Sequence, residues 1–470
     1  MTEVRPAQPP HWIFISLAIG AYAALVASAP SLTARSALAA PLALAILACW
    51  TLAAPHRWIA AFMAAALLLP PLPIPLGDSG PHLSLLFAAF GILAGALYIR
   101  DWQITTGPFP LALLSLFSIL LASTAFAALY SGLEIALQTL ARVLLFGIGV
   151  YVFFYAAYIR PEDHPERLRP LFWVAMASAA IACVDFYYQL PAPAGFGPQF
   201  IWTGAGIYRR AQGIFYEAST LGNFCAFFLV MIALAFTRQR GKMSISRPTL
   251  LAGGVVFSAA LIFSYSRSSV VCLLVALAAL AWLDRSRIRW RRALSLLGIS
   301  VTAGAAVSYY FLPQIVQASW QRLSGSVIYL SDYGEDIFSG RFESWRVLLR
   351  FLAAHPWHAV FGIGYKTLPY SDYIGQKVIS DNMYLSMLVE TGVAGLAVLV
   401  WFNIAILNAA RQAARHANPN ASFFGTWMFC FWLGQCVQML SADLLTYWRV
   451  LPVYFLVLAW AIRAGRAPAP

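Results

Sequence analysis

The sequence contains few charged residues. Asp, Glu, Lys and Arg together make up 10% of its 470 residues, whereas 61% are hydrophobic. Soluble domains carry about 25% charged residues. A soluble chain could not cover this much apolar surface, because it has too few polar side chains to place on the outside. The scarcity of charge therefore excludes an ordinary soluble domain and indicates a chain whose solvent is lipid.

The sequence also lacks the patterns typical of metal sites, disulfide frameworks and nucleic-acid binders. Its six cysteines fall inside apolar runs without Cys-x-x-Cys or Cys/His spacing, so we expect small, buried, free side chains. His355 and His358 have a ligand-like spacing but no further ligand pattern, and we expect neither a metal nor a cofactor. The net charge of +13 comes from short gaps between apolar runs, so no nucleic acid is expected as a partner.

Long apolar runs are what the sequence does contain. A helix needs about 20 apolar residues to cross a hydrocarbon core of about 30 Å. Fourteen runs approach this length and predict an all-α polytopic membrane protein with about 12–14 transmembrane helices. The runs are 12–29, 37–54, 57–76, 82–99, 109–129, 133–158, 168–190, 214–236, 249–266, 268–283, 293–311, 382–409, 421–440 and 447–463.

Lys and Arg are distributed unevenly between the connections of these runs. If the N-terminus is cytoplasmic and the runs alternate in direction, 19 of the 31 basic residues lie in cytoplasmic segments and 5 in the short outer segments. Short cytoplasmic loops carry an excess of Lys and Arg. The sequence therefore predicts a multi-pass protein of the bacterial inner membrane, with both termini cytoplasmic and the lipid bilayer as its first partner.

One long segment interrupts the series of runs. It divides the chain into a transmembrane bundle at 1–311, a periplasmic loop at 312–381 and C-terminal transmembrane helices at 382–470. Loops of this length usually have a function. Apolar residues at helical spacing predict an amphipathic helix near 340–354 that lies on the membrane surface. These residues are Phe342, Trp345, Leu349 and Leu352.

Four polar features lie in the predicted outer segments, at the ends of apolar runs. They are Gly206–Glu217 with Arg209, Arg210 and Glu217, Ser264–Ser269 with Arg267, Ser339–Arg350 with Arg341, and Ile379–Leu385 with Asp381, Asn382 and Tyr384. A single arginine at a helix end usually reaches the lipid headgroups and has no other role. Four such features on one face, however, predict a shared site.

Arginines beside carboxylates suit one kind of chemistry. Guanidinium groups bind phosphate oxygens in bidentate fashion and stay charged. They also stabilise the charge that develops on a departing diphosphate. A carboxylate can then accept the proton of an attacking hydroxyl. This pattern favours transfer of a group from a diphosphate donor.

At these residues the chain resembles the bacterial O-antigen ligase and O-antigen polymerase family. The resemblance covers about residues 205–400, and the first 200 residues match only as generic membrane spans. No one motif is decisive, but their order and the long outer loop agree with the family. The motifs are RRAQGIFYEAS, SYSRSSV, SGRFESWRVLLRFLAAHPWHAVFGIGY and DNMYLSMLVETGVAGL.

The resemblance implies a helical, metal-independent glycosyltransferase of the GT-C type. Its donor would be a glycan on undecaprenyl diphosphate, used at the periplasmic face. Arginines matching Arg210, Arg267 and Arg341 would hold the diphosphate. Further candidates for substrate binding are Arg209, Asn382 and Tyr384, and the candidate catalytic bases are Asp381 and Glu217.

The chain departs from the ligases at one position. Ligases have a histidine before the asparagine, followed by nine residues, a glycine, two residues and a small residue. Here Asp381 precedes Asn382, while Gly392 and Gly395 keep the frame. A carboxylate is a weaker base than an imidazole, which puts lipid A-core ligase activity in doubt. The segment around Glu217 is more similar to polymerase and exopolysaccharide members.

We therefore predict a polymerase that joins lipid-linked repeats into O-antigen or exopolysaccharide. A second lipid-linked repeat would be its acceptor and a chain-length regulator its protein partner. A ligase of the same family, acting on lipid A-core for lipopolysaccharide or on protein hydroxyls, is the first competing hypothesis. A lipid-linked glycan transporter or flippase is the second, although the sequence lacks the related halves of many transporters. A non-catalytic envelope-synthesis subunit is the third.

Overall fold

The computed structural model describes most of the predicted spans. It covers residues 11–54, 56–72, 81–104, 106–158, 165–191, 197–203, 206–215, 217–238, 245–285 and 341–466. The predicted run 293–311 and the loop residues 312–340 lie outside the described residues.

Every other predicted run corresponds to a helix, and the all-α membrane class is confirmed. The first ten helices are α1 (His11–Ser28), α2 (Leu32–Leu52), α3 (Arg57–Leu68), α4 (Ser84–Leu97), α5 (Pro108–Ser131), α6 (Leu133–Tyr158), α7 (Pro165–Tyr188), α8 (Ala218–Thr237), α9 (Arg247–Phe263) and α10 (Arg267–Leu283). After the long loop come α14 (Arg341–Ala354), α15 (Pro356–Phe361), α16 (Met383–Ala414), α17 (Pro419–Gln438) and α18 (Leu451–Ala464). Two short 3-10 helices, η1 (Ile99–Asp101) and η2 (Leu444–Thr446), complete the helical elements of the described residues.

Five of the described helices are long and apolar enough to cross a membrane, and six shorter apolar helices accompany them. The helix α3 is shorter than the predicted run 57–76, because it ends at Leu68 just before Pro70 and Pro71. Proline disfavours helical conformation in the residue that precedes it. The sheet in the described residues is one antiparallel hairpin, β1 (Phe200–Thr203) with β2 (Gly206–Arg209).

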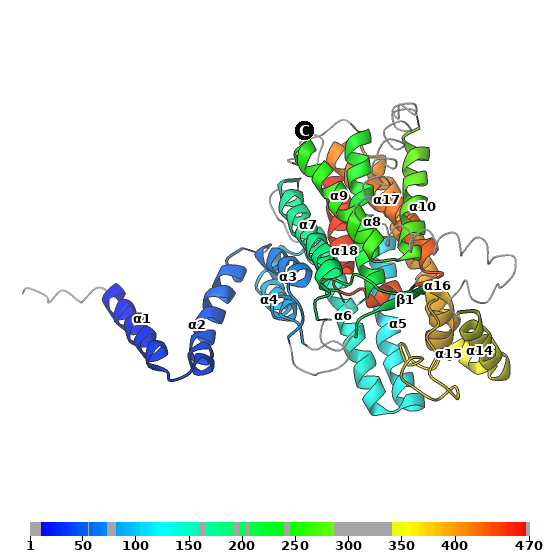
Figure 1. The fold of residues 1–470 in the computed structure, drawn as a ribbon, viewed down its shortest axis with the longest axis horizontal. Coiled ribbons are helices and arrows are strands. Elements are labelled where there is room, and N and C mark those ends of the chain that lie inside the picture. Colours follow the sequence, from blue (N-terminus) through cyan, green and yellow to red (C-terminus); the bar gives the residue numbers. More distant parts are fainter. Residues whose placement is uncertain are drawn as a thin grey trace, which may run out of the picture.

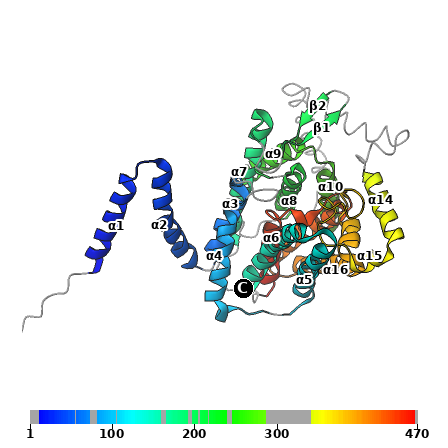
Figure 2. The same cartoon turned by 90° about the horizontal axis from the view of Figure 1, so that it is seen from below.

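The helices pack around α18. Figure 1 shows α5 to α10 and α16 to α18 gathered in one bundle, with α1 and α2 set to one side, as Figure 2 also shows. Residues Leu451–Ala461 of α18 are all buried, as expected for a helix that is apolar on every side. Around it, Phe227 stacks on Trp427 at 4.2 Å between ring centroids and lies 4.5 Å from the Tyr454 ring.

The six cysteines are free. The predicted burial is confirmed for three of them, Cys225, Cys272 and Cys430. It is wrong for Cys49 of α2, which is exposed, because α2 stands beside the bundle and not within it (Figure 1). Cys183 and Cys436 are partly buried.

The connecting segments that the sequence predicts on the outer face lie together at one end of the bundle. Hydrogen bonds join these segments across long stretches of sequence. They run from Ser131 Oγ to Ser371 Oγ (2.9 Å), from the Ala211 amide to the Phe263 carbonyl (2.9 Å) and from the Met383 amide to the Met439 carbonyl (2.8 Å). The polar features of the sequence therefore lie at a common end. That this end faces the periplasm stays a prediction of the charge rule.

The opposite end joins segments predicted to be cytoplasmic. Arg238, which follows α8, donates from Nε and Nη2 to both carboxylate oxygens of Asp284 after α10, at 2.9 and 3.0 Å. It also donates to the Ser422 hydroxyl of α17 at 3.0 Å. Because α8 and α10 both end here, both must begin at the end that holds the polar features.

A kink divides α16 at Gly392, whose φ of 73° is in the left-handed region. The carbonyls freed by the kink are used by the loop after α15. Ile363 N–H donates to the Val389 carbonyl at 3.1 Å, and Gly364 N–H donates to the Glu390 carbonyl at 2.8 Å. A Cβ on Gly392 would lie 2.1 Å from the Val360 carbonyl oxygen. The kink therefore requires glycine both for its φ angle and for its close backbone contact.

We expect Gly392→Ala to destabilise the protein. A left-handed alanine costs of order 1–3 kcal/mol, and the collision with Val360 adds to this cost. Thermal unfolding of the purified protein in detergent measures the effect. The matched control is Gly254→Ala in the regular helix α9, where the nearest atom to a new Cβ is 4.0 Å away. Alanine there should keep or raise the melting temperature. Equal melting temperatures for Gly392→Ala and wild type would contradict the kink argument.

The helix α14 lies where the sequence predicts an amphipathic helix, and it buries Leu352 of the predicted stripe together with Leu348. Leu348 and Leu352 are buried against the loop after α15 and the first part of α16. Leu349 is 55% exposed and Phe342 is 38% exposed, and that these two residues contact the membrane surface stays a prediction. Adjacent apolar faces satisfy the same helical spacing, and only the position of the neighbouring segment decides between them. The division of the chain into three parts stays a prediction.

Candidate active site

The first predicted feature leaves the hairpin and turns toward α9. The guanidinium of Arg210, one residue after β2, donates from Nε to the Ser264 carbonyl at 2.8 Å. This contact places Arg210 beside the Ser264–Ser269 break. Burial lowers the pKa of Arg210, while Tyr447, Glu217 and Asp381 act to raise it. A partly desolvated guanidinium forms strong charge-assisted hydrogen bonds with anions.

Arg209 has a different environment, although it is the neighbouring residue. Its Nη2 donates to Asp185 Oδ1 at 3.2 Å and also bonds the Leu190 carbonyl. The other oxygen of Asp185 accepts the amides of Gln212 and Gly213 at 3.1 and 2.9 Å. Arg209 and Asp185 thus fix the shape of the loop that presents Arg210. The structure does not bring the Arg209 guanidinium into the contacts that Arg210 makes.

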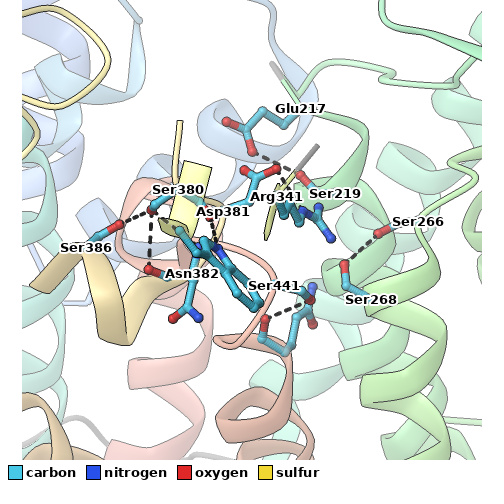
Figure 3. Close-up of polar contacts among 12 residues, drawn as sticks. Glu217, Ser219, Ser266, Ser268, Arg341, Ser380, Asp381, Asn382, Ser386 and Ser441 are labelled. Carbon is cyan, nitrogen blue, oxygen red and sulfur yellow. Dashed lines mark hydrogen bonds and ion pairs between the residues drawn. The ribbon is translucent and has the colours of Figure 1, made fainter. Parts of the chain in front are cut away.

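The second predicted feature is a serine-rich turn between α9 and α10. Ser266 lies at the N-terminal cap position of α10, and its hydroxyl bonds the hydroxyls of Ser268 and Ser269 at 3.3 and 2.8 Å. Arg267 begins α10 and lies within electrostatic range of Arg341. Figure 3 shows Ser266 and Ser268 in the same region as Arg341 and Glu217. The turn therefore brings a third arginine to the site.

The third and fourth features meet directly. Arg341, the first residue of α14, donates from Nε to Asp381 Oδ2 at 3.1 Å. Trp345, one turn later, donates to the Ser380 carbonyl at 2.7 Å. These bonds hold α14 against the residues that precede α16 (Figure 3). Asp381 has a φ of 44°, a left-handed conformation that aspartate tolerates better than most residues.

The two other candidates in the fourth feature have structural partners. The side-chain oxygen of Asn382 accepts the Leu385 amide at 3.1 Å and caps the start of α16. Tyr384 donates its hydroxyl to the Cys436 carbonyl of α17 at 3.0 Å. Both side chains fix α16, and their predicted role in substrate binding stays a prediction.

Glu217 lies immediately before α8 and faces the same region. Its Oε2 accepts the Ser219 hydroxyl at 3.0 Å, and its carboxylate lies close to Asp381 and Arg341 in Figure 3. Burial raises the pKa of Glu217; Lys366 lowers it, and Asp381 and Asp443 raise it. A carboxylate with a raised pKa is better matched to proton transfer near neutral pH than an ordinary one.

The sequence interpretation missed two charged residues that lie at this end. Lys366 Nζ pairs with Asp443 Oδ2 at 2.6 Å, and both side chains are about 15% exposed. Asp443 is an acidic residue in the short outer segment between the last two runs, so the rule that selected Glu217 could have found it. Lys366 follows the Gly362-x-Gly364 turn in the long loop, and nothing in its local pattern indicates proximity to α8.

Backbone strain is concentrated here. Four non-glycine residues in the described part of the chain have a positive φ, and three of them lie in the predicted features or in the Lys366–Asp443 pair. They are Tyr265 at 49°, Lys366 at 57° and Asp381 at 44°. Residues in such conformations persist only where the surrounding structure holds them, and they cluster at functional sites.

The two histidines with ligand-like spacing, His355 and His358, lie between α14 and the end of α15, and His358 bonds the Tyr373 hydroxyl at 3.1 Å.

The fold and this cluster define a helical membrane protein with an arginine- and carboxylate-rich site at one end of its bundle. Residues 252–400 match the family model described as O-antigen ligase. This match supports the assignment to the O-antigen ligase and polymerase family and confirms the resemblance seen in the sequence over these residues. Members of this family are glycosyltransferase-like enzymes. No curated protein matches the chain.

The matched segment contains part of the site. It includes Arg267, Arg341, Lys366 and Asp381, whereas Arg210, Glu217 and Asp443 lie outside it. The hydrogen bond from Arg210 to Ser264 and the ion pair between Lys366 and Asp443 connect the two groups. Residues on both sides of the family domain thus contribute to one cluster.

Proposed function

We propose that this protein is a periplasmic-face glycosyltransferase that joins undecaprenyl-diphosphate-linked oligosaccharide repeats into O-antigen or exopolysaccharide. The observation that carries the proposal is the meeting of Arg210, Arg267 and Arg341 with Glu217 and Asp381 at one end of the bundle. The membrane fold and the family match support a donor that is linked to a lipid and bound at the membrane boundary.

The arginines would bind the diphosphate. Arg210 is anchored through Nε, and its terminal nitrogens are the groups that a bidentate phosphate contact uses. Arg341 is anchored in the same way by Asp381. Positive charge fixed in advance stabilises the departing diphosphate more than the bound substrate, because charge grows on the leaving oxygen as the sugar is transferred.

A carboxylate would accept the proton of the acceptor hydroxyl. The oxygen of the acceptor hydroxyl forms a bond to the anomeric carbon of the donor sugar. The bond between this carbon and the diphosphate oxygen breaks, and the lipid diphosphate leaves with the electron pair of that bond. We favour Glu217 as the base over Asp381, since burial raises the pKa of Glu217 whereas Asp381 is engaged by Arg341. Asp381 would then orient Arg341.

A ligase remains the second candidate function. It is favoured by the description of the matched family and by Gly392 and Gly395, which keep the spacing seen in ligases. The ligase would use the same donor site and transfer the glycan to lipid A-core or to a protein hydroxyl. The two functions therefore differ in the acceptor, not in the diphosphate chemistry.

Purified protein in lipid nanodiscs tests the proposal. One sample receives undecaprenyl-diphosphate-linked repeats alone, and a parallel sample receives repeats together with lipid A-core. We expect a ladder of products longer than one repeat in the first sample, with one undecaprenyl diphosphate released per new linkage. Products only on lipid A-core would establish the ligase instead. No transfer in either sample, with donor repeats confirmed intact, would overturn the glycosyltransferase assignment.

A further inference from the structure

A second charged cluster lies at the opposite end of the bundle from the candidate active site. A cavity of about 280 Å³ lies there between the ends of α10 and α16, the first half of α17 and the residue that follows α8. The helix α17 packs against both α10 and α16, and this is the upper end of the bundle in Figure 1. The lining of the cavity includes both charged and aromatic side chains, namely Arg238, Asp284, Arg411, Arg415, Trp282 and Phe429. The cavity therefore offers a ligand two kinds of contact.

One wall of the cavity is held in place by hydrogen bonds. Arg238 pairs with both carboxylate oxygens of Asp284 at 2.9 and 3.0 Å. The same guanidinium donates to the hydroxyl and to the carbonyl of Ser422 at 3.0 and 3.2 Å. The Ser422 hydroxyl in turn donates to the Ala414 carbonyl at 2.8 Å. These contacts join the ends of α8, α10 and α16 to α17, so the cavity is part of the packed bundle.

The other charged groups of the lining are Arg411 and Arg415, which lie one turn apart at the end of α16. Both residues are exposed, and neither has a carboxylate partner among the described residues. Side chains four residues apart on a helix are neighbours, and like charges at this spacing repel each other. Asp284 is already paired with Arg238. The lining therefore has an excess of positive charge, which an anion between Arg411 and Arg415 would neutralise.

The apolar part of the lining lies where the apolar sequence of α10 ends. Trp282 and Leu283 are the last two residues of this helix, and they are 65% and 37% exposed. Phe429 of α17 lines the same cavity. Tryptophan is enriched where membrane helices meet water, so the cavity lies at the boundary between lipid and water. A free phosphate would contact only the arginines, whereas a phospholipid would use both parts of the lining.

We propose that this cavity binds the phosphate headgroup of an anionic phospholipid. Arg411 and Arg415 contact the phosphate, and Trp282 and Phe429 contact the first part of an acyl chain. The distribution of Lys and Arg predicts that this end is cytoplasmic, and basic pockets between helices on that side suit anionic headgroups. The lipid binds where α10, α16 and α17 meet and thus stabilises this end of the bundle. The inference is independent of glycosyl transfer, because none of these residues belongs to the candidate active site.

Titration of the full-length protein in a neutral detergent with phosphatidylglycerol tests the inference, with bound lipids counted by native mass spectrometry. The wild type should bind phosphatidylglycerol more tightly than phosphatidylcholine with the same acyl chains, because phosphatidylcholine has no net charge. The double variant Arg411→Gln with Arg415→Gln should lose about 30-fold in affinity for the first phosphatidylglycerol, the combined effect of two basic residues at an anionic lipid surface. Both residues are exposed and glutamine is a good helix former, so this variant should fold.

A matched control removes two arginines from the same end of the bundle. Arg247 begins α9 and Arg466 follows α18, and both are exposed and lie outside the lining of the cavity. The double variant Arg247→Gln with Arg466→Gln should bind phosphatidylglycerol as the wild type does. Equal losses in the two double variants would show that only the general positive charge of this end attracts lipid, and would overturn the inference. A wild type that binds the two phospholipids equally would overturn it as well.

A soluble phosphate separates a lipid ligand from a free anion. Glycerol 3-phosphate has the same phosphate chemistry without acyl chains, and the wild type should bind it much more weakly than phosphatidylglycerol. Trp282→Ala keeps all the arginines and should weaken the binding of phosphatidylglycerol. Equal affinity for the two ligands, or an unchanged affinity for phosphatidylglycerol in Trp282→Ala, would show that the acyl chain makes no contact here. Either result would overturn the assignment of a phospholipid to the cavity.

Discussion

We expect Glu217→Gln to lower the kcat of the proposed repeat transfer by about 100- to 10,000-fold, the range that general bases contribute. Glutamine keeps the size of the side chain and its ability to accept the Ser219 hydroxyl, but it cannot take a proton. The donor should still bind, so KM should change much less than kcat. Initial rates of lipid-linked product formation, measured against donor concentration, separate the two parameters.

Two further variants make this expectation specific to Glu217. Asp381→Asn keeps a side chain that tolerates the left-handed backbone and should lower kcat less than Glu217→Gln does, because it loosens Arg341 without removing the proton acceptor. Glu343→Gln removes an exposed carboxylate of α14 that pairs with Arg346, and it should leave both parameters unchanged. If Asp381→Asn costs more kcat than Glu217→Gln does, Asp381 is the base and the roles proposed for the two carboxylates are reversed.

We expect Arg341→Gln to lower the kcat of the proposed transfer by about 100- to 1,000-fold, as loss of one preorganised charge-stabilising donor does. The guanidinium is fixed by Asp381 at 3.1 Å, so it needs no reorganisation when charge develops on the leaving diphosphate. Lysine at this position should restore only part of the rate, because it lacks the planar, bidentate geometry of arginine. The measurement is the rate of undecaprenyl diphosphate release at saturating donor.

Arg346 provides the matched control for Arg341. It lies on the same helix and pairs with the exposed Glu343 at 2.7 Å, outside the contacts of the site. Arg346→Gln should keep nearly full activity. Equal losses in Arg341→Gln and Arg346→Gln would show that α14 contributes only general positive charge, and the assigned role of Arg341 would be wrong.

The membrane fold could be predicted from the sequence because each apolar run is a local signal. A run long enough to cross lipid must satisfy its own backbone, and a helix does this within one segment. The described runs accordingly became helices, and the proline cluster at Pro70 and Pro71 ended α3. The kink of α16 was harder to predict from the sequence. Gly392 is visible in the sequence, but its contact with the Val360 carbonyl depends on a loop that packs from outside the helix.

The candidate site could be predicted only in part, because neighbouring residues can take different environments. Arg209 ends a strand and Arg210 follows it, and successive residues in extended chain point to opposite sides. Their guanidinium groups accordingly contact Asp185 in one case and the Ser264 carbonyl in the other. Composition and spacing treat the two arginines alike.

Lys366 and Asp443 show a second limit of the sequence. They lie far apart in the chain and belong to no shared motif, yet their side chains meet at 2.6 Å. Such a pairing depends on how α16 bends and on where η2 lies, and neither is a local property. The charge rule can place both residues on one face, but only the packed structure shows that they touch.

The central claim is that Arg210, Arg267 and Arg341 bind one diphosphate at this end of the bundle. Equilibrium binding of a short isoprenyl diphosphate without sugar, to protein in nanodiscs, tests it most directly. We predict that the wild type binds the diphosphate more tightly than the matching monophosphate. The triple glutamine variant of these arginines should lose at least about 100-fold in affinity, since each hydrogen bond to a charged group contributes about 1.5–3 kcal/mol, while Arg346→Gln binds as the wild type does. Equal affinity in the triple variant and the wild type would contradict the account.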